Sequence, residues 1–323
     1  MTGIRLWWRL SIEGAVMPVA RQSMISTPNA EALRDLIAET PLVALKSYPG
    51  VLLKCEHENP SGSHKDRAYV RMLSSLEGVE AASTLCDFTT GNGGISLAWL
   101  ARRLSKRAVV FMPDGMTKER SELIRANGAE LIITPRHDFI RGAREAAEQY
   151  VERHPSSLLI NQSDNLANQA AYIDAGGEVV RQCGELGLSP RAFVCGLGTG
   201  GAFSGFSFAM AERFNPFSCV AIEVAEAPVI WAKRQGVIVT PKLPSIIGFG
   251  AGTVARNTDE RLIDDLEVVS IDDVREPLER LKEQDGLSVG PSTAANVWVA
   301  AKRAEQLRAP VVTISFDRGD RYS

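Results

Sequence analysis

Short apolar segments alternate with amphipathic segments along almost the whole chain, and this alternation restricts the possible folds more than any other feature. Strand-like apolar runs occur, for example, at residues 83–88, 108–113 and 310–317, and helical patterns occur at residues 95–105 and 292–308. Strands that alternate with helices pair in parallel and are covered by helices. The sequence therefore predicts an α/β fold with mostly parallel sheets.

The composition argues against several classes of protein. The net charge is −3 and no long basic run occurs, so we expect no nucleic-acid partner. The apolar stretches are shorter than the ~18 residues that a membrane span needs, so we expect no membrane partner. The five cysteines are scattered without a CxxC spacing, which favours buried, reduced thiols over disulfides or a metal site. We expect a cytoplasmic protein.

The first residues form a segment apart from this pattern. Arg9 and Glu13 interrupt its apolar run, which argues against a signal peptide, and an organelle transit peptide is the weaker alternative. We expect residues 1–24 to be a flexible N-terminal extension and the fold to begin near Thr27.

One lysine stands in the first turn of a predicted helix. The segment NPSGSHKDR, residues 59–67, leads into a helix expected at residues 63–78. The helix dipole disfavours a positive charge at this end. Taken alone, Lys65 has two interpretations: a solvated surface side chain, or an amine kept partly neutral by the helix end and burial, as a Schiff-base lysine requires.

Two glycine-rich turns each follow a predicted strand and precede a predicted helix. TTGNGG, residues 89–94, offers backbone amides that suit a carboxylate, and Asn92 could reach a ring oxygen. GLGTGGA, residues 196–202, offers successive amides that suit a phosphate. The second turn lacks the GK[ST] of a P-loop and fits the dinucleotide fingerprint only loosely. Each turn alone is weak evidence.

Together these segments resemble the motifs of fold-type II pyridoxal 5′-phosphate (PLP) enzymes, above all the cysteine synthase and cystathionine β-synthase family. NPSGSHKDR resembles its lysine motif, TTGNGG its substrate loop T-S-G-N-T-G, and GTGGA its phosphate loop G-T-G-G-T. Further matches follow in the family's order: NQSDN (161–165), GFGAG (248–252), GPSTAAN (290–296) and VVTISFDRGDRY (311–322). The resemblance covers roughly residues 35–323.

The resemblance implies a tryptophan synthase β-like fold of two domains and a homodimer. A smaller α/β domain with the substrate loop is expected at residues 58–165. A larger α/β domain with the phosphate loop is expected from residues 25–57 together with residues 166–323.

The resemblance also implies a role for each matching residue. Lys65 is expected to carry PLP as a Schiff base and to remove the α-proton of the substrate. Asn92 is expected at the ring hydroxyl and Ser292 at the pyridine nitrogen. The phosphate is expected at Gly198, Thr199, Gly200, Gly201 and Ala202, and the substrate carboxylate at Thr89, Thr90, Gly91, Gly93 and Gln162. No metal is expected.

The implied reaction is β-replacement on an O-activated L-serine, either O-acetylserine or O-phosphoserine, through an aminoacrylate, with sulfide adding to give L-cysteine. A hydroxyl such as that of Ser292 makes the pyridine ring a weaker electron sink than a carboxylate does, which favours β-elimination over transamination. Two alternatives are an amine-nucleophile synthase of the diaminopropionate type in specialised metabolism, and a non-catalytic paralogue that binds a partner's peptide carboxylate. A serine/threonine dehydratase fits the C-terminal motifs less well.

The chain departs from the family's pattern beside the cofactor. His64 replaces an apolar residue and is expected to be either a tolerated, half-exposed side chain or a participant in proton transfer near Lys65. Ala202 lacks the hydroxyl that usually ends the phosphate loop, so Thr199, Ser204 or water would supply that hydrogen bond.

Three further departures concern the substrate side. Gly93 replaces a threonine and Ser163 replaces an aromatic residue, and both changes are expected to widen the site. Arg256 stands where the family has a small residue; a surface arginine is the simpler interpretation, and binding of an anionic substrate is the alternative.

Overall fold

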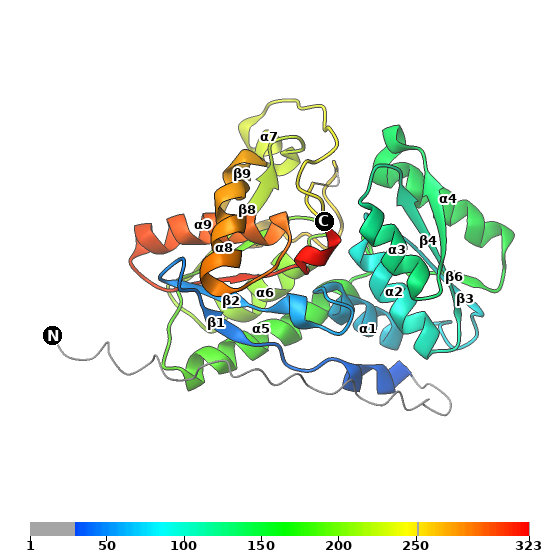
Figure 1. Cartoon of the computed structure of the whole chain (residues 1–323), viewed down its shortest axis with the longest axis horizontal. Coiled ribbons are helices and arrows are strands. Elements are labelled where there is room, and N and C mark those ends of the chain that lie inside the picture. The colour runs from blue at the N-terminus through cyan, green and yellow to red at the C-terminus, as the bar shows by residue number, and fades with distance from the viewer. Residues whose placement is uncertain (1–29, 251, 323) are drawn as a thin grey trace.

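Two sheets organise the chain, whose computed structural model describes residues 30–250 and 252–322 (Figure 1). The larger sheet has the strand order β1-β2-β10-β7-β8-β9, in which only β1 runs antiparallel to its neighbour; the smaller sheet, β5-β4-β3-β6, is fully parallel. The strands are β1 (Leu42–Ala44), β2 (Val51–Lys54), β3 (Thr84–Phe88), β4 (Arg107–Pro113), β5 (Glu130–Thr134), β6 (Ser157–Leu159), β7 (Ala192–Gly196), β8 (Ser218–Val224), β9 (Asp265–Val269) and β10 (Val311–Ile314). The predicted α/β fold with mostly parallel sheets is confirmed.

Helices flank both sheets. They are α1 (Lys65–Ser75), α2 (Asn92–Arg103), α3 (Lys118–Ala126), α4 (Phe139–Arg153), α5 (Ala167–Glu185), α6 (Gly201–Ala211), α7 (Val229–Gln235), α8 (Arg275–Asp285) and α9 (Pro291–Leu307). In the part of the chain that the structure describes, no helix is long and apolar enough to cross a membrane. The predicted extension at residues 1–24 lies outside the described residues.

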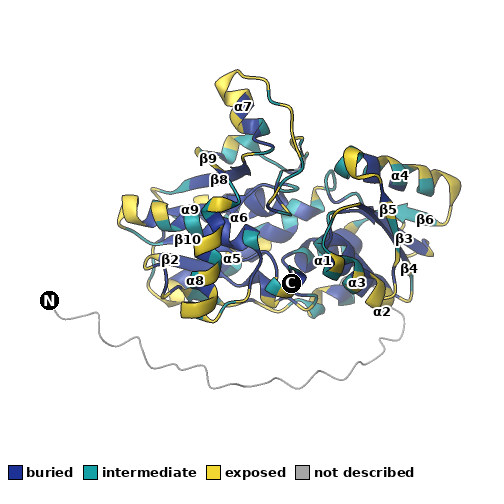
Figure 2. Ribbon diagram, turned by 45° about the horizontal axis from the view of Figure 1, so that its top comes forward, coloured by how far each residue is buried: buried dark blue, intermediate teal, exposed yellow. Residues whose placement is uncertain are grey.

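The smaller sheet shows why its strands read as continuous apolar runs. Along β4, Val110 and Met112 face the main core with α2, whereas Val109 and Phe111 face a second core with α4. Successive strand residues point to opposite faces, so a sheet covered on both faces needs apolar residues at every position. Figure 2 shows the two central strands, β3 and β4, largely in the colour of buried residues, and exposed residues on the outer helices. All four strands of this sheet lie within residues 58–165; the predicted domain boundaries themselves stay predictions.

The long helix α5 was not predicted from the sequence. Its glycines lower the intrinsic preference for a helix. Gly176 is nevertheless required there, because a Cβ on it would lie 2.7 Å from the Cβ of Ala209 on α6. The packing of α5 against α6 therefore overrides the local propensity.

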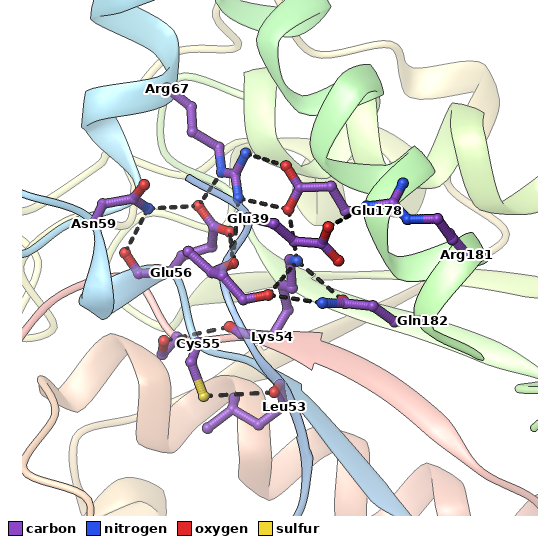
Figure 3. Close-up of polar contacts among 12 residues, drawn as sticks. Glu39, Leu53, Lys54, Cys55, Glu56, Asn59, Arg67, Glu178, Arg181 and Gln182 are labelled. Atoms are coloured by element: carbon purple, nitrogen blue, oxygen red, sulfur yellow. Dashed lines mark hydrogen bonds and ion pairs between the residues drawn. The ribbon is translucent and has the colours of Figure 1, made fainter. Parts of the chain in front are cut away.

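A buried ionic network ties α5 to β2 and α1 (Figure 3). Glu178 accepts hydrogen bonds from Lys54 at 2.7 Å and from two nitrogens of Arg67 at 2.6 and 2.8 Å. Nε of Arg67 also binds Glu56 at 2.7 Å. Burial lowers the pKa of Lys54, while Glu178 acts in the opposite direction. The two cations are tolerated in the interior because each has a carboxylate partner.

The C-terminal segment connects the two sheets. Asp317, which follows β10, is fully buried and accepts from Arg120 of α3 at 3.2 Å and from the Tyr322 hydroxyl at 2.7 Å. Asn92, the first residue of α2, donates to the same oxygen of Asp317 at 2.7 Å. The carboxylate of Asp317, just after the last strand of the larger sheet, thus holds two helices that cover the smaller sheet.

Candidate active site

A cavity of about 310 Å³ lies where the carboxyl ends of β3, β7 and β10 approach one another. Ligands of parallel α/β folds bind at such strand ends. Eleven of the predicted site residues line the cavity: Lys65, Thr89, Thr90, Asn92, Gly93, Gln162, Gly198, Thr199, Gly200, Ala202 and Ser292. The two remaining predicted residues do not line the cavity. Gly91 belongs to the loop after β3, and Gly201 begins α6. The fold therefore gathers three segments that are far apart in the sequence.

Lys65 begins α1 and reaches the phosphate loop. Its Nζ donates to Oγ1 of Thr199 at 3.2 Å. Burial lowers the pKa of Lys65 to about 8, and the carboxylate of Asp87 opposes that shift. A measurable fraction of the amine is therefore neutral near pH 7–8, as attachment to an aldehyde requires. A solvated surface lysine is not what the structure shows.

The glycine-rich loop before α6 forms a compact anion cradle. Gly200 has φ +79°, and a Cβ on it would lie 2.0 Å from Oγ1 of Thr258, so only glycine fits. The backbone amides at the start of the 11-residue α6 are available to an anion. Of the two hydroxyls expected to replace the one missing at Ala202, Thr199 lines the cavity. Ser204 does not: it is buried and accepts from the amide of Asp259 at 2.9 Å.

Asn92 is oriented by Asp317. A carboxylate only accepts hydrogen bonds, so Nδ2 of Asn92 must face Asp317, and its second N–H remains for another acceptor. Oδ1 of Asn92 is buried and has no partner among the described residues. The turn before Asn92 needs Gly91, with φ +142°, because a Cβ there would lie 2.2 Å from Cδ of Arg120.

Ser292 lines the cavity from the start of α9. It is the second residue of α9, is 2% exposed and lines the cavity. Its hydroxyl makes no hydrogen bond to another residue that the structure describes, so it is available to a ring nitrogen.

The predicted carboxylate site consists of the loop after β3 and Gln162. Oγ1 of Thr89 accepts from the amide of Gly91 at 3.0 Å, and Nε2 of Gln162 donates to the carbonyl of Phe88 at 2.9 Å. The expectation that Gly93 widens the site is wrong, because the space beside it holds the hydroxyl of Tyr69 and the amide of Gln162.

Two other departures from the family pattern have clear positions. Ser163 lines the cavity, as its expected effect on site width requires. Arg256 is exposed and does not line the cavity, although its neighbours at 253–255 do, so the surface interpretation holds.

His64 is buried, so its interpretation as a half-exposed side chain is wrong. It is 8% exposed, lines the cavity beside Lys65, and packs on Phe316 with ring centroids 4.7 Å apart. Its Nδ1 lies 2.8 Å from the hydroxyl of Tyr172, which also lies 3.1 Å from the carbonyl oxygen of His64. The hydroxyl has a single proton for these two acceptors, so the tautomer of His64 depends on which of them receives it. Burial lowers the pKa of His64 well below its usual value, so the ring is neutral.

These residues fit PLP. A partly neutral amine, an anion cradle, an amide with a free N–H and an unpaired hydroxyl face one cavity, and together they match an aldehyde, a phosphate, a ring hydroxyl and a ring nitrogen.

The family described as "Pyridoxal-phosphate dependent enzyme" matches residues 33–317. The chain belongs to this family. It is an enzyme chain whose cofactor is PLP, and its relatives lie on the cysteine synthase side of the family. A Bacillus subtilis (strain 168) protein named "Probable cysteine synthase" is 34% identical over 299 residues, which cover 89% of this chain and 94% of the relative.

Solved structures agree with this assignment. An O-acetylserine dependent cystathionine β-synthase from Helicobacter pylori is 30% identical, with a TM-score of 0.79 over 90% of this chain and 96% of that one. O-ureido-L-serine synthase is 29% identical, with a TM-score of 0.81 over 90% of this chain and 92% of that one. The fold-type II resemblance is therefore confirmed, and the names of these relatives show that the family makes several different products.

The sequence did not predict the residues that hold the site residues in position. Asp317 lies in the matched C-terminal segment, but its pairing with Asn92 depends on the fold. Asp87 lies two residues before the substrate loop, and Tyr69 lies one helical turn after Lys65. Their adjacency to predicted residues was the available signal; which of them point toward the site could not be read from spacing.

Proposed function

We propose that this chain catalyses PLP-dependent β-replacement on an O-activated L-serine, O-acetylserine or O-phosphoserine, with sulfide as the nucleophile and L-cysteine as the product. The observation that carries the proposal is the position of Lys65, whose Nζ lies 3.2 Å from the phosphate loop in a cavity that the predicted carboxylate loop also lines. The cysteine synthase relatives support the same reaction.

PLP, when bound, withdraws electrons from the substrate α-carbon so that a leaving group on the β-carbon can depart. The chain's own groups supply the rest. The free amides of the loop after β3 and the side chain of Gln162 would hold the substrate carboxylate; the amides of Thr89 and Gly91 are already used within the protein. Nζ of Lys65 would take the α-proton and hold it. The hydroxyl of Ser292 would meet the ring nitrogen without fully protonating it, which favours β-elimination.

The direct experiment supplies purified, PLP-loaded protein with O-acetylserine or O-phosphoserine and sulfide, and measures L-cysteine. Lys65→Ala is the matched variant and should form none, because it loses both the attachment point and the base. Arg256→Ala is the control outside the cavity and should retain full activity. Cysteine formation by Lys65→Ala at the wild-type rate would contradict the proposal.

The amine-nucleophile alternative is tested in the same assay. The relatives make cystathionine and O-ureidoserine as well as cysteine, so the family does not fix the nucleophile. Consumption of O-acetylserine only when an amine replaces sulfide would favour a diaminopropionate-type synthase. Binding of an amino acid without consumption under any condition would favour the non-catalytic paralogue.

Two further expectations belong to this proposal. A homodimer should elute in size-exclusion chromatography at about twice the mass of the 35.1 kDa chain. A cytoplasmic location is supported by the five cysteines, all of which are free and buried in the structure.

A further inference from the structure

The space beside Gly93 is filled by polar groups from other elements. A Cβ built on Gly93 would lie 2.7 Å from Oη of Tyr69, 2.8 Å from Nε2 of Gln162 and 3.1 Å from Oγ1 of Thr89. Contacts under 3.0 Å are essentially never seen for real Cβ atoms. Any side chain at position 93 would therefore displace Tyr69 or Gln162.

Tyr69 is not free to move aside. It lies on α1, one turn after Lys65 and on the same face of the helix, and it is 0% exposed. Its hydroxyl donates to Oδ2 of Asp87 at 2.6 Å. Moving the ring would break a short hydrogen bond to a buried carboxylate and disturb the packed core.

Asp87 in turn holds both halves of the carboxylate site. Its Oδ1 accepts from the amide of Phe88 at 2.9 Å, directly before the loop, and its Oδ2 accepts from the amide of Gln162 at 3.3 Å. The orientation of the Asp87 carboxylate therefore sets the spacing between the loop and Gln162. The hydrogen bond from Tyr69 fixes that orientation.

We infer that Tyr69 is a positioning residue for the substrate carboxylate. Its hydroxyl takes the place of the side chain that the family's loop carries at the position of Gly93, and through Asp87 it sets the spacing between the loop and Gln162. The inference rests on the proposed function in one respect, that the substrate is an α-amino acid held by its carboxylate.

A double-mutant cycle of Y69F and G93A tests this inference. Y69F keeps the ring and removes the bond to Asp87, so KM for O-acetylserine should rise about tenfold with kcat little changed. G93A alone should raise KM at least as much, because its Cβ meets the tyrosine hydroxyl. In the Y69F background G93A should cost less than in the wild type, since the contact with that oxygen is gone and the one with Nε2 of Gln162 remains.

The pH dependence gives a readout that a purely structural role would not move. Burial raises the pKa of Asp87 to about 6, and the hydrogen bond from Tyr69 lowers it. Removing that bond in Y69F raises the pKa of Asp87 further. The rise of KM on acidification should therefore begin at a higher pH in Y69F than in the wild type.

Binding is measured separately by titrating the PLP-loaded proteins with L-serine and following the absorbance of the cofactor. This measurement needs no turnover, so it separates a failure of the inference from a failure of the proposed reaction. Tyr150→Phe removes a hydroxyl outside the cavity and should bind L-serine like the wild type. Unchanged binding in Y69F, additive costs in the cycle, or no binding of L-serine by the wild type would each overturn the inference.

Discussion

At the scale of single residues, the buried histidines make the stability of the fold depend on pH. His57 is 8% exposed and its Nδ1 lies 2.6 Å from Oγ of Ser315. Burial and the nearby Arg318 lower the pKa of His57 from 6.5 to about 4. The imidazole of His57 therefore gains a proton below pH 6.5 in the unfolded chain, but only below about pH 4 in the folded chain. His57 favours folding above pH 6.5, and this contribution is lost as the pH falls.

The expected change in the free energy of unfolding follows from the shift in the pKa of His57. Between pH 7 and pH 5, His57 should contribute a loss of about 2 kcal/mol in the free energy of unfolding. Urea unfolding of the wild type and His57→Gln at both pH values measures it, with the exposed His137→Gln as control. An equal decrease in the wild type and His57→Gln would show that His57 titrates normally in the folded protein.

His64 gives a second prediction at this scale. Tyr172→Phe frees Nδ1 of His64 and removes the hydroxyl that fixes its tautomer. If Nε2 of His64 takes part in proton transfer near Lys65, kcat should fall about tenfold or more, as for loss of a general acid–base group. Steady-state kinetics with O-acetylserine and sulfide measure the change, and an unchanged kcat would leave His64 a packing residue.

At the scale of elements, Glu178 is the centre of the contact between α5, α1 and β2. Glu178→Ala leaves Lys54 and Arg67 buried without this partner, so the free energy of unfolding should fall by about 3–5 kcal/mol. The matched control is Arg181→Ala on the same helix, which removes an exposed ion pair with Glu39 and should cost less than about 1 kcal/mol. Chemical denaturation distinguishes the two, and equal losses would argue against the network.

The elements that the sequence predicted well are those with a strong local signal. The buried strands at residues 84–88, 107–113 and 192–196 were found because parallel strands covered on both faces are apolar at most positions. Helix α5 was missed, and α2 begins at Asn92 rather than at residue 95, because glycines occupy positions that tertiary contacts require. A neighbouring element, and not the local sequence, requires the glycine at such a position, so the local pattern does not predict it.

The site shows the same division. Motifs placed Lys65, Asn92 and Ser292 at one cavity, since each follows or begins a recognisable turn. The pairing of Asp317 with Asn92 and that of Tyr69 with Asp87 join segments far apart in the chain. No local pattern specifies such pairs, so they could be found only from the fold.

At the scale of the whole molecule, Asp317 holds the two sheets together through Arg120 and Asn92. Asp317→Ala leaves Arg120, which is 1% exposed, without a counter-ion. The free energy of unfolding should fall by about 3–5 kcal/mol, and affinity for PLP should fall because Asn92 loses its orientation. Asp320→Ala, on the exposed side of the same segment, is the control. A stable Asp317→Ala variant with wild-type affinity for PLP would contradict this view of the junction.

We expect Lys65 to carry PLP in the cavity between the two sheets. Borohydride reduction of the PLP-loaded protein fixes the cofactor on whichever lysine holds it, and mass spectrometry of the digested protein identifies that lysine. We expect the modified peptide to contain Lys65 and the Lys65→Ala variant to give no modified peptide. Attachment to a different lysine, or none in the wild type, would contradict it.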